Sequence, residues 1–219
     1  MHLSDVKAKI PKDLYDVLNE KIKQFRPSQE KSINAGLLDG QNLLVCTPTA
    51  SGKTLIAELA GMKAILEGRG KAVYIVPLKA LASEKFRDFK DKYGQLCKVA
   101  MSIGDVDKAD PQLSKYDFII TTSEKLDSLM RHHSPWITSI AVIIVDEVHL
   151  LNDASRGPTL EILLTMLRQV VKAQVVALSA TIGNPHELAT WLDARLIEDD
   201  WRPVELKKGV YMNGEVTFY

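Results

Sequence analysis

Short apolar runs recur along this 219-residue chain, and they predict the core of its fold. Each run is four to five residues long, is rich in Val and Ile, and does not alternate between apolar and polar residues. The runs cover residues 42–46, 72–76, 117–121, 141–145 and 174–178. Strands of a parallel sheet are covered on both faces and therefore read as continuous apolar runs. We expect these five segments to form the strands of one mostly parallel sheet.

A stretch with helical spacing follows each apolar run. The apolar positions on one helical face are Leu55, Leu59, Met62 and Leu66 after the first run, and Leu160, Leu163, Leu167 and Val171 after the fourth. Gly68 marks the end of the first of these helices. Strand-then-helix units predict a doubly wound α/β fold with helices on both faces of the sheet. Ligands of such folds bind beyond the carboxyl ends of the strands.

Two segments lie outside this alternation and suggest a division of the chain. Residues 1–40 predict an N-terminal helical segment with helices over 12–23 and 28–39, stopped by Gly40. Residues 41–203 hold the sheet. Residues 204–219 contain Asn213-Gly214 between two apolar-rich arms, which predicts a β-hairpin. Residues 104–116 have weak patterning and predict a surface loop.

Composition narrows the class of protein. Hydrophobic residues make up 46% and charged residues 26% of the chain, as in ordinary soluble domains. No apolar run approaches the roughly 20 residues of a membrane span, and the start lacks a signal-peptide core, so we expect no membrane partner and a cytoplasmic location. Cys46 and Cys97 are expected at buried strand positions, without metal-ligand spacing. The 28 basic and 28 acidic residues cancel, which counts mildly against nucleic-acid binding.

The stretch TPTASGKT follows the first predicted strand and nearly matches a phosphate-binding loop. Such a loop needs converging backbone N–H groups, a helix N-terminus, a lysine for the terminal phosphates and a hydroxyl for magnesium. The candidate nucleotide-binding residues are Thr47, Pro48, Thr49, Ala50, Ser51, Gly52, Lys53 and Thr54. Thr47 departs from the usual first glycine, and the Cβ of Ala50 restricts the backbone. A Gly-Lys-Thr helix start without a ligand is the alternative, and the strand before and amphipathic helix after favour the cradle.

Two adjacent acids follow the fourth predicted strand. Asp146 and Glu147 would therefore lie at the same sheet edge as the loop. Asp146, together with Thr54, is expected to hold magnesium, and Glu147 to orient or deprotonate an attacking water. A pair of acids in an ordinary strand-to-helix turn is the alternative.

At this point the motifs resemble those of the superfamily-two DExH helicases. Asp146-Glu147-Val148-His149 matches their acidic signature, residues 25–29 the adenine-reading Q motif, and residues 77–85 motif Ia. Gly104-Asp105, residues 121–129 and Ser179-Ala180-Thr181 match further motifs in the family's order. Residues 155–161 and 182–185 are most similar to the Ski-like family, particularly the archaeal Hjm-type DNA repair helicases. The resemblance runs from about residue 11 to 206.

The resemblance implies a RecA-like P-loop domain that uses ATP and Mg²⁺. It implies catalytic roles for Lys53, Asp146, Glu147 and His149, and nucleotide contacts from Gln29, as the reader of the base edge, and from Phe25. Ser179 and Thr181 would couple nucleotide state to the nucleic acid through His149. A structural histidine is the alternative for His149.

The resemblance also implies a nucleic-acid site, which a neutral chain can build from backbone amides and helix N-termini. The candidate residues at this edge are Leu78, Lys79, Ala80, Gly104, Asp105, Thr121, Thr122, Ser123 and Lys125. Ordinary N-capping by Ser and Thr is the alternative for the hydroxyl residues. A grip on the backbone predicts little base-sequence preference.

Every motif of the family's first half is present, and the Gln-x-x-Gly-Arg-x-Gly-Arg motif of the second is absent. That motif supplies the arginine that stabilises phosphoryl transfer. We therefore expect the first motor domain alone, with residues 204–219 leading towards a second RecA-like domain of the parent chain. The fragment should bind nucleotide, hydrolyse it weakly and not unwind.

Three functions stay open from the sequence. The first is the motor of a helicase or translocase that acts on single-stranded or branched DNA in repair or recombination. The second is the motor of a Ski-like RNA helicase. The third is a nucleotide-gated binding module without turnover.

Overall fold

The computed structural model describes residues 1–104, 110–205, 207–212 and 214–218. Its centre is a seven-stranded sheet with the order β3-β4-β2-β5-β6-β1-β7, in which all strand pairs are parallel. The strands are β1 Leu43–Cys46, β2 Lys71–Val76, β3 Val99–Ser102, β4 Phe118–Thr122, β5 Ile140–Val145, β6 Gln174–Ser179 and β7 Arg195–Glu198. From β1 the chain runs through β2 to β3 at one edge, and then turns back through β4, β5 and β6 to β7 at the other edge. Such a change of direction is expected of a doubly wound α/β fold. The predicted fold class is confirmed.

The five predicted strands correspond to β1, β2, β4, β5 and β6, which are the inner strands of the sheet. Their side chains are buried on both faces, which explains the continuous apolar runs. The prediction missed β3 and β7. These are the two edge strands, and β7 exposes Arg195 and Glu198, so its sequence shows no apolar run.

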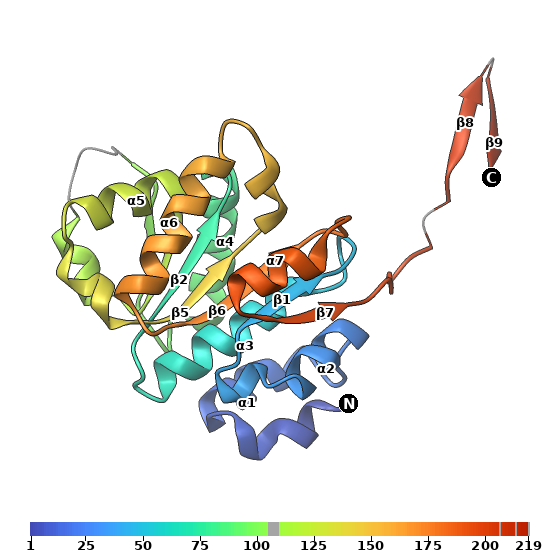
Figure 1. Ribbon diagram of the computed structural model, residues 1–219. Coiled ribbons are helices and arrows are strands. Elements are labelled where there is room, and N and C mark those ends of the chain that lie inside the picture. Colours follow the sequence, from blue (N-terminus) through green and yellow to red (C-terminus); the bar gives the residue numbers. More distant parts are fainter. Residues whose placement is uncertain (105–109, 206, 213, 219) are drawn as a thin grey trace.

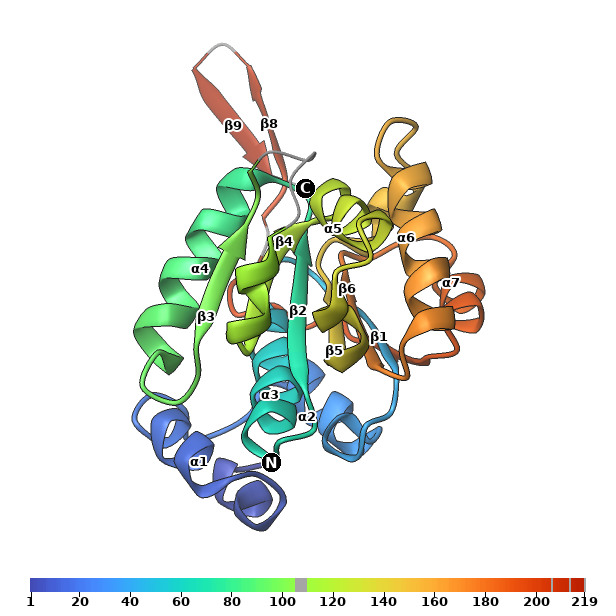
Figure 2. The ribbon, with the colours of Figure 1, turned by 90° about the vertical axis from the view of Figure 1, so that its left-hand side faces the viewer.

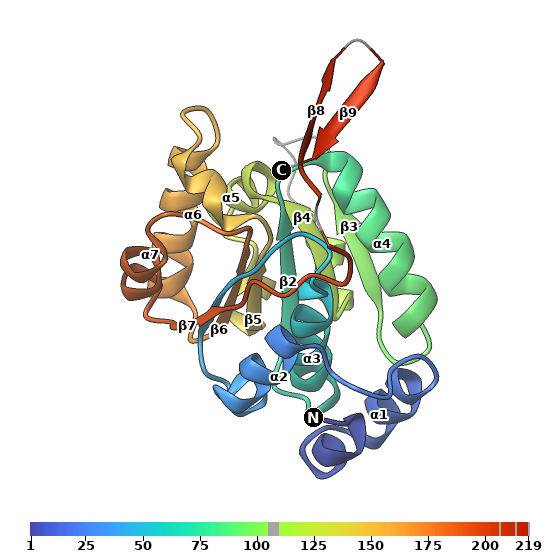
Figure 3. The same cartoon turned by 90° about the vertical axis from the view of Figure 1, so that its right-hand side faces the viewer.

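Helices cover both faces of the sheet (Figures 2 and 3). The α-helices after the strands are α3 Lys53–Leu66, α4 Lys79–Tyr93, α5 Ser123–Arg131, α6 Gly157–Val170 and α7 Pro185–Leu192. Short 3₁₀ helices are η3 Pro111–Lys115, η4 Pro135–Ser139 and η5 Val148–Asn152. One buried cluster joins α3 and α4 to a face of the sheet that includes Tyr74, and a second joins α5, α6 and α7 to the other face. The sheet therefore separates two hydrophobic cores.

The N-terminal segment packs on the α3 side of the sheet (Figure 3). It consists of η1 Leu3–Lys9, α1 Lys12–Asn19, α2 Pro27–Asn34 and η2 Leu37–Asp39. Both predicted helices were too long at their C-terminal ends. Gly36, with φ of 96°, ends α2 in the left-handed region and starts η2, which stops at the predicted Gly40.

The C-terminal segment forms the predicted hairpin from β8 Gly209–Met212 and β9 Glu215–Phe218. Figure 1 shows the hairpin standing away from the sheet, and the side chains of both strands are exposed. Of the predicted Asn213-Gly214 turn, Asn213 lies outside the described residues. Among the residues described, no helix is both long and apolar enough to cross a membrane.

Three smaller predictions can be compared with the structure. Cys46 is a buried residue of β1, as predicted, whereas Cys97 is buried but lies before β3 rather than in a strand. Cys97 lies in the turn between α4 and β3. The apolar residues around it are therefore explained by burial and not by a strand. Of the predicted surface loop over 104–116, residues 105–109 lie outside the described residues, and the rest contains η3, whose Leu113 is buried.

Candidate nucleotide-binding site

Hydrogen bonds fix the conformation of the loop between β1 and α3. The backbone N–H of Thr47 donates to the Ser179 carbonyl at 3.2 Å, and the Thr47 and Ser51 hydroxyls share a buried hydrogen bond of 2.8 Å. Lys53 Nζ folds back over the loop and donates to the Thr47 carbonyl at 2.8 Å. The threonine that replaces the usual first glycine therefore supplies a cross-link that a glycine could not form.

Two residues of the loop adopt left-handed backbone conformations, Ala50 with φ of 65° and Gly52 with φ of 94°. A Cβ built on Gly52 would lie 2.5 Å from Gln29 Nε2 and 3.2 Å from Arg26 Cδ. Glycine is therefore needed at position 52 for both conformation and space. Ala50 adopts its conformation despite a Cβ, at a cost of about 1 kcal/mol or more.

The segment that resembles the Q motif braces this loop from α2. Gln29 is 4% exposed; its Oε1 accepts from the Arg26 N–H at 2.9 Å and its Nε2 donates to the Gly52 carbonyl at 3.0 Å. Arg26 Nη1 donates to the Ala50 carbonyl at 2.7 Å, and its guanidinium lies 5.5 Å from the ring centroid of Trp201. These contacts hold α2, the loop and the segment after β7 together. The reading of a base edge by Gln29 stays a prediction.

Phe25 was predicted to contact the nucleotide, and that contact stays a prediction. Its side chain is 4% exposed and packs in the hydrophobic core beneath α2. Arg26, which contacts the Ala50 carbonyl, and Trp201 beside it were not singled out from the sequence.

The two acids lie at the carboxyl end of β5. The backbone N–H of Asp146 donates to the Ile75 carbonyl at 2.9 Å, which continues the pairing of β5 with β2. Asp146 Oδ1 accepts from the Glu147 N–H at 3.1 Å, and its Oδ2 accepts from the Tyr74 hydroxyl at 2.9 Å. Glu147 has φ of 51°, a strained value for a residue with a side chain.

Tyr74 is a site residue that sequence reasoning missed, because it lies inside an apolar strand run. It is 0% exposed. Burial, followed by the charge of Asp146 and its hydrogen bond, raises the pKa of Tyr74 well above its ordinary value. The hydroxyl therefore stays protonated and donates steadily to Asp146, which orients that carboxylate.

The electrostatics of Lys53 connect the loop to the acidic pair. Burial lowers the pKa of Lys53, and the negative charges of Glu147 and Asp146 oppose this change. Lys53 begins the helix after β1 and the two acids follow β5, so all three lie at the carboxyl edge of the sheet. This is the arrangement predicted for a phosphate loop and its acidic partner.

Lys85 on α4 is a second residue that sequence reasoning did not single out. Its Nζ donates to Thr54 Oγ1 at 3.1 Å and lies 6.0 Å from the centroid of the Tyr74 ring. It ends the segment 77–85 quoted for motif Ia, whose expected role was limited to nucleic acid. Lys85 instead lies next to the hydroxyl expected to bind magnesium.

The oxygen atoms of Thr54 and Asp146 fit Mg²⁺, which prefers hard oxygen ligands. The described residues contain no cluster of three or more His, Cys, Asp or Glu side chains that could enclose a metal. Mg²⁺ typically keeps several waters and binds through one or two protein oxygens plus substrate phosphates. An open pair of oxygens beside a phosphate loop suits that mode of binding.

His149 and Ser179 lie beside Glu147, as the coupling hypothesis expects. His149 Nδ1 is 3.3 Å from Glu147 Oε2 and 3.5 Å from Ser179 Oγ. The Ser179 carbonyl also accepts from the backbone N–H of Thr47 in the loop. Thr181 is exposed and takes no part in this set of contacts.

The proposed nucleic-acid residues divide into an exposed and a buried group. Leu78 is 44% exposed, and Lys79 and Ala80 are exposed at the start of α4. Gly104 is exposed as well, whereas Asp105 lies outside the described residues.

The buried group lies at the start of α5. Thr121 donates to the Ser102 carbonyl at 2.7 Å, and Thr122 caps α5 by accepting from the Lys125 N–H at 3.5 Å. Ser123 is 6% exposed and Lys125 only 2%, with Nζ 3.3 Å from Asp110 Oδ2. Thr121 and Lys125 therefore serve internal contacts in this structure, whereas the start of α4 and Gly104 are exposed.

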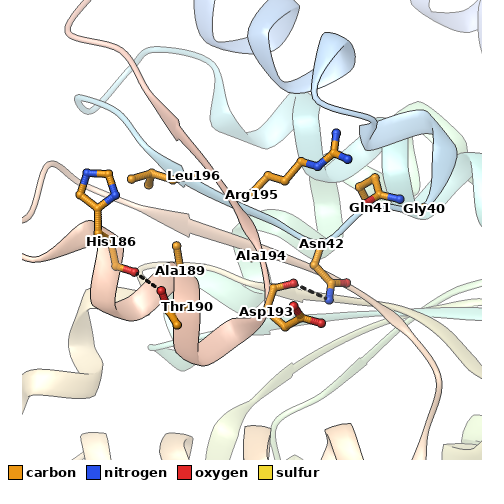
Figure 4. Close-up of a pocket in the computed structure, with 10 residues that line it drawn as sticks. All are labelled: Gly40, Gln41, Asn42, His186, Ala189, Thr190, Asp193, Ala194, Arg195 and Leu196. Atoms are coloured by element: carbon orange, nitrogen blue, oxygen red, sulfur yellow. Dashed lines mark hydrogen bonds between the residues drawn. The ribbon is translucent and has the colours of Figure 1, made fainter.

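A separate hollow lies away from the loop and the acidic pair. It has a volume of about 620 Å³, and Figure 4 shows it between the segment before β1, the helix α7 and the start of β7. Asn42 Nδ2 donates to the Asp193 carbonyl across it at 3.1 Å. It opens at the amino ends of β1 and β7, opposite to the phosphate loop, and contains no predicted site residue.

Fold and site together define a RecA-like domain with a phosphate loop and a facing acidic pair. The family model of the DEAD/DEAH box helicases matches residues 26–188. The chain therefore belongs to the DEAD/DEAH box helicase family.

Curated relatives narrow the comparison. The chain is 53% identical to the ATP-dependent DNA helicase Hel308 of Pyrococcus abyssi over 94% of this chain and 29% of that protein. It is 56% identical to Hel308 of Methanocaldococcus jannaschii over 90% of this chain and 17% of that protein. The chain thus spans less than a third of the length of either relative. A crystal structure of the DUF1998 helicase MrfA bound to DNA shares the fold, with a TM-score of 0.74, 24% identity, and coverage of 88% of this chain and 30% of that one.

Proposed function

We propose that the chain is the ATP-binding motor domain of an ATP-dependent DNA helicase or translocase. The observation that carries this proposal is that the phosphate loop follows β1 and the acidic pair follows β5, at the same carboxyl edge of one parallel sheet. Lys53 would contact the terminal phosphates of ATP, and Thr54 and Asp146 would hold Mg²⁺. Mg²⁺, when bound, neutralises charge on the phosphates.

Glu147 would orient the attacking water in this proposal. Its backbone has a strained φ of 51°, and His149 Nδ1 lies 3.3 Å from its Oε2. His149 would then report the state of the terminal phosphate to Ser179, whose carbonyl is bonded to the loop. Both side chains are thus positioning and coupling residues in the proposed cycle.

The nucleic-acid partner proposed is single-stranded or branched DNA, in repair or recombination. The curated relatives are named ATP-dependent DNA helicases, and identity to two of them exceeds one half. The exposed start of α4 offers the first-turn backbone N–H groups of a helix without a side-chain cap, and the ammonium of Lys79. Such a grip contacts phosphates without a large basic surplus, which fits a formal net charge of zero.

The proposed division of labour places the rest of the cycle outside this chain. Residues 1–40 would brace the nucleotide site, residues 41–203 form the first RecA-like domain, and residues 204–219 lead towards a second RecA-like domain. That domain would contribute the arginine that stabilises the developing charge. This chain should then bind nucleotide, hydrolyse it slowly and not separate a duplex.

Fluorescence anisotropy with labelled single strands tests the choice of substrate. We expect the chain to bind single-stranded DNA, with an affinity that changes when Mg²⁺ and a non-hydrolysable ATP analogue are added. RNA of the same base sequence is the matched competitor. Binding of RNA alone would support the Ski-like RNA helicase reading instead.

A second experiment tests turnover against a nucleotide-gated binding module. Glu147→Gln in the longer parent protein should abolish ATP hydrolysis while ATP binding is retained. An unchanged rate of hydrolysis would contradict the role of Glu147. Absence of hydrolysis in the unaltered parent protein would favour the binding module.

A further inference from the structure

Lys85 connects the two oxygen groups that are proposed to bind magnesium. Its Nζ donates to Thr54 Oγ1 at 3.1 Å, and it lies 6.0 Å from the ring centroid of Tyr74. The Tyr74 hydroxyl in turn donates to Asp146 at 2.9 Å. The Lys85 ammonium therefore lies between Thr54 of α3 and Tyr74 of β2, although Lys85 itself belongs to α4.

Lys85 belongs to α4, and a second set of contacts fastens this helix to α3. Glu58 is 8% exposed and lies one helical turn after Thr54. Its carboxylate accepts from Lys92 Nζ and from the Tyr93 hydroxyl, both at 2.6 Å. Tyr93 also packs against Phe89 of α4, with ring centroids 5.8 Å apart. The C-terminal end of α4 is thus anchored by a buried carboxylate.

The contact nearer the start of α4 is of a different kind. It joins one ammonium to one neutral hydroxyl, and Lys85 is only half-buried. Thr54 Oγ1 is also the oxygen proposed to bind Mg²⁺, and an ammonium and a divalent cation on one oxygen repel each other strongly. Lys85 therefore competes with Mg²⁺ for this oxygen.

We propose that Lys85 is a positioning residue that couples Mg²⁺–nucleotide binding to the strand-holding start of α4. This inference rests on the proposed function. Lys85 releases Thr54 when Mg²⁺ and nucleotide bind, and the start of α4 shifts while its far end stays anchored on Glu58. Lys79 lies less than about two helical turns before Lys85, so the same shift moves the proposed strand contact. Linkage requires that strand binding alter Mg²⁺–nucleotide affinity by the same factor.

The test compares nucleotide affinity with Mg²⁺ and with a chelator, in the 219-residue chain. The probe is the β,γ-imido analogue of ATP, measured by calorimetry with and without single-stranded DNA. Lys85→Met removes the ammonium but keeps the aliphatic stem over Tyr74. We expect the ratio of affinities, Mg²⁺ over chelator, to rise about fivefold or more, because the competing charge is lost while screening limits the effect.

The same variant should uncouple the two ligands. In the unaltered chain the analogue with Mg²⁺ changes the affinity for single-stranded DNA, and in Lys85→Met this change should disappear. Lys85→Arg keeps a positive charge and should retain the Mg²⁺ dependence. Lys90→Met is the matched control, since Lys90 is exposed on the same helix and lies over Phe86, away from Thr54.

Each outcome decides the inference. Unaltered Mg²⁺ dependence and unaltered coupling in Lys85→Met would overturn it, even if stability falls, because a purely structural lysine predicts that result. The same change in Lys90→Met would also overturn it by showing a general charge effect. Should Lys85→Met fail to fold, Lys85→Gln provides the same measurement. Failure of the unaltered chain to bind the analogue would refute the proposed function itself, which is a different result.

Discussion

The substitution Gly52→Ala should destabilise the fold and loosen the phosphate loop. The new Cβ would lie 2.5 Å from Gln29 Nε2, and φ at this position is 94°. The left-handed conformation costs an alanine about 1–2 kcal/mol. Displacing Gln29 leaves a buried amide without its partner, at about 1–3 kcal/mol. Allowing for overlap between the two terms, we expect a loss of roughly 2–4 kcal/mol in the free energy of unfolding.

Urea denaturation followed by circular dichroism measures this loss. Gly68→Ala is the matched control, because Gly68 has φ of 69° but a Cβ there would have no neighbouring atom within 4 Å. It should lose only the conformational part, about 1–2 kcal/mol. A double-mutant cycle with Gln29→Ala isolates the collision, since truncation of Gln29 removes the atom that the Cβ meets. Equal losses in Gly52→Ala and Gly68→Ala would refute this reasoning about Gln29.

Two further predictions concern buried polar groups. Tyr74→Phe removes the hydroxyl that orients Asp146, so stability should fall by about 1.5–3 kcal/mol in urea denaturation and more Mg²⁺ should be needed for nucleotide binding; unchanged values of both would contradict the role of this hydrogen bond. Burial raises the pKa of Cys46 to about 11 and of Cys97 to about 12, from an ordinary 9.0. Both thiols stay neutral in the folded chain at pH 8, so iodoacetamide should modify them only after unfolding. Mass spectrometry can count the modified cysteines. The raised values also predict that their contribution to stability is complete below pH 9 and is lost as the pH rises through about 11 and 12; rapid modification of the folded chain would contradict this.

The inner strands could be predicted from the sequence because a strand that is buried on both faces is apolar at nearly every position. Edge strands carry less of that signal. In β7, Arg195 and Glu198 face solvent, so only two of four residues are apolar and the run is lost. The end of the second N-terminal helix was misplaced because the left-handed turn at Gly36 stops it before the amphipathic pattern ends.

The candidate site was predictable where local chemistry sets the residue type. The loop and the acidic pair lie on consecutive residues beside strands, so their spacing reveals them. Tyr74 and Lys85 are brought to the site only by the tertiary fold. In the sequence, Tyr74 is one residue of an apolar strand run and Lys85 one residue of an amphipathic helix, so neither position stands out. Lys125 shows the converse, because a lysine after a hydroxyl cluster suggests a phosphate contact, but the fold buries it against Asp110.

Calorimetric titration of this chain with Mg²⁺ and the β,γ-imido analogue of ATP tests the central claim most directly. The account predicts one binding site in the unaltered chain, and severe weakening in both Lys53→Ala and Asp146→Asn. The Asp146→Asn variant should keep much of its affinity in the presence of a chelator, whereas Lys53→Ala should not. Binding that is equally strong in the unaltered chain and in Lys53→Ala would contradict the claim that the loop and the acidic pair form one nucleotide site.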